Sequence, residues 1–71
     1  MKFRMVVANY KNGDNFWIEE MDTQTCHCIY DYLEANPEGT AEEYAREVVM
    51  YFNSTLRPGE SKRFLIRAEE V

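Results

Sequence analysis

The residues best suited to chemistry in this 71-residue chain are Cys26, His27 and Cys28, which follow one another directly. Thiolates and imidazoles are the usual zinc ligands, and a structural zinc site takes about four of them. The sequence has no other cysteine or histidine. Consecutive side chains on a helix point about 100° apart, so these three cannot meet at one ion. We therefore expect no metal and no cofactor, with Cys26 in the core and His27 facing solvent.

Covalent catalysis needs a nucleophile, a base and an orienting group in one pocket. The only serines, Ser54 and Ser61, lie near the end of a predicted helix, far along the chain from His27. Neighbouring acids such as Glu42 and Glu43 point in different directions and form no acid–base pair. The three glycines are isolated turn residues, so they form no phosphate-binding loop. We predict that the protein is not an enzyme.

Residues 2–10 are rich in β-branched and aromatic types, and Phe3, Met5 and Val7 alternate with basic residues. This period of two predicts a strand with one face in the core. Residues 62–68 show the same alternation and predict a third strand. We expect this third strand to pair beside the first.

The Asn12-Gly13 pair predicts a two-residue turn that leads into a second strand over residues 16–21. Such a turn places Lys11 opposite Asp14, and opposed residue numbers then sum to 25. In this register the core face carries Phe3, Met5, Val7, Phe16 and Ile18. The other face carries Arg4, Val6, Ala8, Tyr10, Trp17 and Met21.

Two helices are predicted between the second and third strands. An apolar stripe of Cys26, Ile29, Tyr30 and Leu33 follows helical spacing, with Asp22 or Thr23 as the cap and Asn36-Pro37 as the end. A second helix is expected from Ala41 to Thr55. Its start carries the capping-box pattern, in which Thr40 caps the helix and Glu43 reaches back.

The resulting order, ββααβ, predicts one α+β domain over residues 1–71. In the economical packing, a three-stranded antiparallel sheet carries both helices on one face. No apolar run approaches the roughly 20 residues that span a bilayer. Two nearby cysteines cannot form the long-range disulfide bonds that stabilise a small secreted domain. We therefore expect a cytoplasmic protein.

The charge distribution is uneven along the chain. The net charge is −5, yet residues 12–45 contain nine acidic residues and no lysine or arginine. The other positions hold all eight basic residues and four acidic ones. A surface so rich in one charge repels itself and is best explained by a basic partner.

The leading hypothesis is therefore a protein that binds a basic, nucleic-acid-binding protein through carboxylates that occupy the place of phosphates. Its predicted acidic contacts are Glu19, Glu20, Asp22, Asp31, Glu34, Glu38, Glu42 and Glu43. Tyr10 and Trp17 are predicted as apolar anchors, because such rings dominate binding hot spots.

Two other classes remain open. Arg4, Arg63 and Arg67 beside Tyr10 and Trp17 would suit single-stranded nucleic acid, although the net charge opposes a polyanion. A self-associating module would bury the exposed aromatic face in a homodimer.

In size, acidity, ββααβ order and exposed aromatic residues, the whole chain resembles the small acidic proteins of bacteriophages and mobile elements, including anti-CRISPR inhibitors. No motif carries this resemblance, so no residue roles follow from it. The resemblance implies a non-enzymatic inhibitor in the bacterial host cytoplasm. Such an inhibitor would occupy the nucleic-acid-binding or effector-docking surface of a host defence complex.

Overall fold

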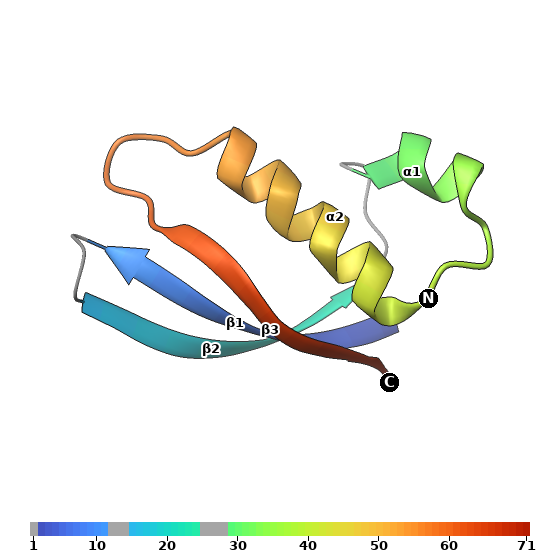
Figure 1. The fold of residues 1–71 in the computed structure, drawn as a ribbon, viewed down its shortest axis with the longest axis horizontal. Coiled ribbons are helices and arrows are strands. Elements are labelled where there is room, and N and C mark those ends of the chain that lie inside the picture. Colours follow the sequence, from blue (N-terminus) through green and yellow to red (C-terminus); the bar gives the residue numbers. More distant parts are fainter. Residues whose placement is uncertain (1, 12–14, 25–28) are drawn as a thin grey trace.

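The computed structural model describes residues 2–11, 15–24 and 29–71. Strands β1 (Lys2–Lys11) and β2 (Asn15–Gln24) are followed by helices α1 (Tyr30–Ala35) and α2 (Ala41–Ser54) and by strand β3 (Lys62–Glu70). All strand pairs are antiparallel, in the order β2-β1-β3. Both helices lie on one side of the sheet (Figure 1). The predicted α+β fold and the position of the last strand beside the first are confirmed.

The register of β1 and β2 differs from the prediction by one residue. Lys11 pairs with Asn15 and Val7 with Glu19, so opposed numbers sum to 26. The turn residues 12–14 lie outside the described residues, as does the expected partner of Lys11. A slip of one residue moves every side chain of a strand to the other face. Phe16 and Ile18, expected in the core, therefore lie on the face away from the helices, where each is more than half exposed.

The core lies between the sheet and α2. Phe3, Met5 and Val7 of β1 are completely buried. They pack against α2 residues at helical spacing, with Ile29 at the α1 end, and the α2 members are Ala41, Tyr44, Ala45, Val48 and Val49. Leu65 and Ala68 of β3 border this cluster. Between them a bulge shifts the register, because Val6 faces Arg67 and Val7 faces Leu65.

The first helix is shorter than expected. Strand β2 continues to Gln24, so Asp22 and Thr23 are strand residues and cap no helix. Helix α1 begins at Tyr30 after Ile29, which provides no side-chain cap. It ends before Asn36-Pro37, as predicted. Cys26, His27 and Cys28 lie outside the described residues.

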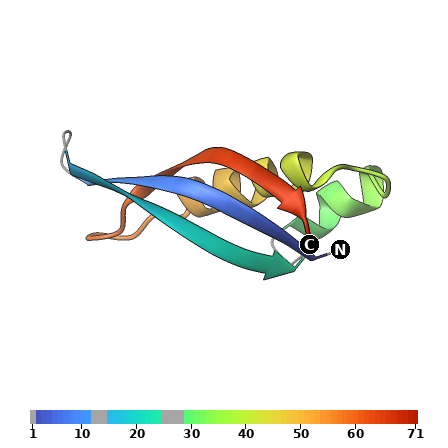
Figure 2. The same cartoon turned by 90° about the horizontal axis from the view of Figure 1, so that it is seen from below.

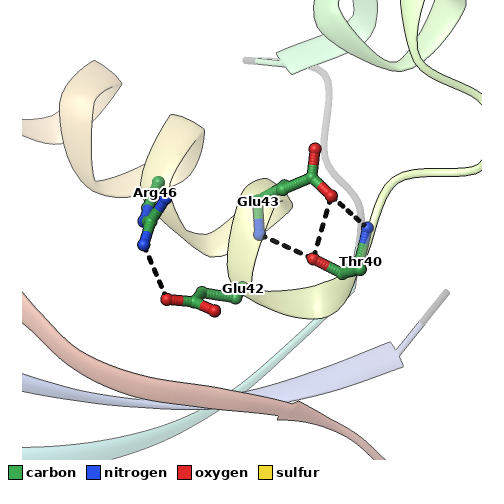
Figure 3. A network of polar contacts seen from close by, with 4 residues as sticks. All are labelled: Thr40, Glu42, Glu43 and Arg46. Atoms are coloured by element: carbon green, nitrogen blue, oxygen red, sulfur yellow. Dashed lines mark hydrogen bonds and ion pairs between the residues drawn. The ribbon is translucent and has the colours of Figure 1, made fainter.

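The second helix begins with the predicted capping box (Figure 3). The backbone N–H of Glu43 donates to the Thr40 hydroxyl at 3.2 Å, and the backbone N–H of Thr40 donates to the Glu43 carboxylate at 3.1 Å. Two donors that the helix leaves free are thus satisfied. The box fixes where α2 starts and holds Glu43 beside α1.

Replacing Thr40 with alanine should lower the free energy of unfolding by about 1 kcal/mol, the usual cost of losing an N-cap. The measurement is the urea midpoint, read at an unchanged slope. Thr55→Ala is the matched control, because its hydroxyl donates only to carbonyls of the last turn of α2. An equal loss in both variants would contradict the role assigned to the capping box.

Candidate protein-binding surfaces

The net charge of the protein resides in its helical half. Residues 29–56, which form α1, α2 and their connection, hold six acidic residues and one basic residue, a net charge of −5. The rest of the sequence holds seven acidic and seven basic residues and is neutral overall. The three acids of β2, Glu19, Glu20 and Asp22, are balanced by the bases of β1 and β3, so the strands add no net negative charge.

Five of these carboxylates lie on α1, on its connection to α2, and on the side of α2 that faces α1. We refer to Asp31, Glu34, Glu38, Glu43 and Glu47 as the α1–α2 acidic surface. Asp31 and Glu47 line one groove of about 310 Å³ between the two helices. Glu38 and Glu43 line a second hollow at the connection. Glu34 lies one turn after Asp31 on the exposed side of α1.

Tyr32 lies between the carboxylates of α2 and the end of α1. Its hydroxyl donates to Glu43 at 3.4 Å, and its ring meets that of Tyr44 edge-on at 6.2 Å. Burial, and then the nearby Glu43 carboxylate, raise the pKa of Tyr32. Bonds from Thr40, first from its backbone and then from its hydroxyl, lower the pKa of Glu43. Glu43 therefore stays charged while Tyr32 remains a neutral donor.

The other predicted acidic contacts are neutralised or lie elsewhere. Glu42 forms an ion pair with Arg46 at 2.7 Å (Figure 3). Glu20 and Asp22 flank Arg4 at 3.3 and 2.8 Å, on the opposite side of the sheet from the helices. The hydrogen bond from Arg4 lowers the pKa of Asp22.

Glu19, the last of the predicted acidic contacts, lies on the helix side of the sheet, on the edge strand β2. Its carboxylate accepts a hydrogen bond from the buried Asn9 amide at 3.3 Å. The eight predicted acids thus do not form one surface. Only Asp31, Glu34, Glu38 and Glu43 come together, and Glu47 joins them.

The face of the sheet away from the helices, called here the open face, is not covered by any described segment (Figure 2). Its residues form four rows across β2, β1 and β3, beyond which the exposed Lys2 of β1 lies opposite Gln24. The rows are Phe16–Tyr10–Lys62, Ile18–Ala8–Phe64, Glu20–Val6–Arg67 and Asp22–Arg4–Glu69, with Ile66 in the bulge beside Arg67.

The apolar rows of the open face are preorganised by ring contacts. Tyr10 stacks on Phe16 at 5.6 Å and meets Phe64 edge-on at 5.0 Å. The ammonium group of Lys62 lies 5.2 Å from the centre of the Phe64 ring. Ile18 and Ile66 are each 53% exposed. A contiguous apolar patch of this kind marks an interaction surface.

The two predicted anchors are on opposite faces. Tyr10 lies on the open face, whereas Trp17 pairs with Asn9 on the helix side. There Trp17 borders a hollow of about 220 Å³ with Phe52, Leu56 and Arg63. The one-residue difference in register explains this separation.

The arginines expected on one face are also separated. Arg63 lies on the helix side, where its Nε–H donates to Asn9 at 3.1 Å and its guanidinium lies over Phe52 at 4.8 Å. Arg4 and Arg67 lie on the open face among three carboxylates. The basic and aromatic set considered for nucleic-acid binding is therefore divided between two surfaces.

Sequence reasoning missed two groups of surface residues. Glu47 was left out because it follows the first base after the acidic stretch, although its spacing of four from Glu43 was a usable signal. Phe16, Ile18, Phe64 and Ile66 were not assigned to an interaction surface. For Phe16 and Ile18 the cause was the expected register.

Within the described ranges, no group of three or more His, Cys, Asp or Glu side chains could hold a metal ion. No described helix is long and apolar enough to span a bilayer. Comparisons with family models, curated proteins and solved structures gave no match to this chain. The assignment of function therefore rests on the surfaces themselves.

Proposed function

We propose that this protein is a non-enzymatic binding protein whose α1–α2 acidic surface engages a basic surface on another protein. Its narrower form, suggested by the likeness to small phage proteins, is an inhibitor in the bacterial cytoplasm. The inhibitor would cover the nucleic-acid-binding site of a host defence complex such as a CRISPR–Cas effector. The carboxylates would take the place of phosphates.

The observation that carries the proposal is the concentration of the whole net charge in the helical half. Asp31, Glu34, Glu38 and Glu47 form no ion pair with any described residue. Like charges held together on a small domain repel one another and destabilise it. A basic partner removes this repulsion, and the same field accelerates association. The charge that costs stability in the free protein therefore favours the complex.

Direct binding of nucleic acid is the weaker alternative. The open face carries four bases, Lys2, Arg4, Lys62 and Arg67, and three acids, Glu20, Asp22 and Glu69. A phosphate backbone binds to a surplus of positive charge, and the surplus on this face is a single charge. With Trp17 and Arg63 on the other side of the sheet, neither face combines all the expected groups.

The test is capture of partners from a bacterial lysate by the tagged protein and by the double variant Glu34→Lys/Glu38→Lys. We expect the variant to capture at least about tenfold less of any basic protein that the original protein captures, because like charges then face each other. Raised salt should weaken capture by the original protein. Glu60→Lys/Glu70→Lys makes the same change in net charge away from the acidic surface and should capture normally. Equal capture by both variants would refute the proposal.

A further inference from the structure

We infer that the open face is the interface of a symmetric homodimer, in which a second copy of this chain covers the apolar rows. This inference is separate from the acidic surface, which would remain on the outside of the dimer. Its basis is the pattern of side chains on the open face, whose apolar rows and Glu20–Arg67 row complement themselves.

The first observation is surplus surface. The protein exposes 5122 Å², about 10% more than the roughly 4,650 Å² expected for a folded monomer of its mass. On the open face Tyr10 is 40%, Phe64 46% and Phe16 58% exposed. A 71-residue domain has a small core and gains much from covering such a face. These exposed rings are what a missing layer would leave uncovered.

The second observation is charge balance. The open face carries Lys2, Arg4, Lys62 and Arg67 against Glu20, Asp22 and Glu69, so its net charge is only +1. The bases Lys62 and Arg67 are on β3, and the acids Glu20 and Asp22 are on β2. A second copy can approach this face without the repulsion that the acidic helical half would cause.

The third observation fixes the arrangement. Homodimers are usually related by a twofold axis, and stacked sheets align within about 30°. A twofold axis along β1 keeps each row over its own counterpart and places β2 of one copy over β3 of the other. Ile18 then meets Phe64 of the second copy, and Tyr10 meets its own equivalent. In the next row Glu20 meets Arg67, twice by symmetry.

The alternative twofold axis, across the strands, fits poorly. It places the first row over the fourth and the second over the third. Phe16 would then meet Asp22, and Ile18 would meet Glu20, so apolar side chains would cover carboxylates. The axis along β1 therefore matches the apolar rows with one another and Glu20 with Arg67. In the fourth row it places Asp22 over Glu69 and Arg4 over its own equivalent, where Arg4 is already paired with Asp22 of its own copy.

The area is sufficient for a modest dimer. Three strands of about ten residues cover roughly 33 Å by 14 Å, or about 460 Å² per copy. This figure does not include the additional area of the protruding side chains. Two copies reach about 920 Å², close to the roughly 1,000 Å² that separates specific interfaces from incidental contacts. We therefore expect dimerisation to depend on protein concentration.

Sedimentation equilibrium over a range of concentrations measures the dimer, and exchanging the charges at Glu20 and Arg67 tests the inference. Glu20→Arg places two arginine pairs in the interface, and Arg67→Glu places two glutamate pairs there. Each variant alone should dissociate at least about tenfold more readily than the original protein, because like charges then meet. An equal mixture of the two should dimerise again, since every Arg faces a Glu.

Circular dichroism should show each variant folded, because both side chains are exposed. Ile18→Asp, in the apolar row, should abolish the dimer by itself. A protein that stays at 8.5 kDa at the highest concentration, or single variants that dimerise normally, would overturn the inference. Glu34→Lys/Glu38→Lys should leave the dimer intact, so loss of partner capture and loss of the dimer are separate results.

Discussion

The variant Phe3→Ala should be largely unfolded at room temperature. Phe3 is completely buried between the sheet and α2, among the largest buried side chains of the core. Truncating a buried phenylalanine costs about 3–5 kcal/mol, from lost apolar burial and from the cavity left behind. A domain of this size has about that much stability in total. Circular dichroism and a urea titration measure the loss.

Phe16→Ala is the matched control, because it removes the same atoms from the other face of the same sheet. Phe16 is 58% exposed, so we expect a loss below about 1 kcal/mol at concentrations where the protein is monomeric. The comparison also tests the register directly. If opposed residues summed to 25, Phe16 would lie in the core and both variants would unfold.

The variant Gly39→Ala should lower the free energy of unfolding by about 1–3 kcal/mol, as overpacking of a core does. A Cβ at this position would lie 2.6 Å from Cε1 of Tyr44. The Tyr44 ring cannot move aside easily, because it is buried and its hydroxyl donates to the Asn36 carbonyl at 3.0 Å. Gly39 thus permits the close turn that carries α1 toward α2.

The Tyr44→Leu background isolates this contact. In this background Gly39→Ala should lower the free energy of unfolding much less. The difference between the two backgrounds measures the coupling between the two positions. Where alanine fits without strain, replacing glycine stabilises a protein by about 0.4–1 kcal/mol. A stabilised Gly39→Ala variant would therefore show that Tyr44 does not constrain the connection.

Features determined by local chemistry could be predicted from the sequence. The Thr40–Glu43 capping box and the end of α1 before Pro37 each depend on a few adjacent residues. The buried face of β1 followed from simple alternation. The long connection through two helices allows β3 to pair beside β1, as expected, but the sequence alone does not determine the strand order.

The register could not be predicted because the run Phe16-Trp17-Ile18 is apolar at every position. Such a run offers a hydrophobic face in either register, so alternation does not choose between them. Asn12-Gly13 indicates where the chain turns, but the loop joining Lys11 to its partner Asn15 is one residue longer than the shortest hairpin. The polar end of β2 became a strand only because β1 provides pairing along its whole length.

The acidic surface was predicted in part for a related reason. The sequence shows which segment lacks basic residues. It does not show which basic residues from distant parts of the chain lie beside that segment in the fold. Arg4 reaches Glu20 and Asp22 across the sheet, and this pairing depends on the register. Asp31, Glu34, Glu38 and Glu47, on α1, α2 and their connection, form no such pair with the described residues.

The most direct test of acidic recognition is an NMR titration of the isotopically labelled chain with a basic peptide of ten lysines. Amide shifts should change along α1, the connection through Gly39 and the first turns of α2. The changes should shrink as salt is added. They should also be lost in Glu34→Lys/Glu38→Lys. Shifts centred on β2 or β3, or an unchanged response in that variant, would contradict binding through the helical half.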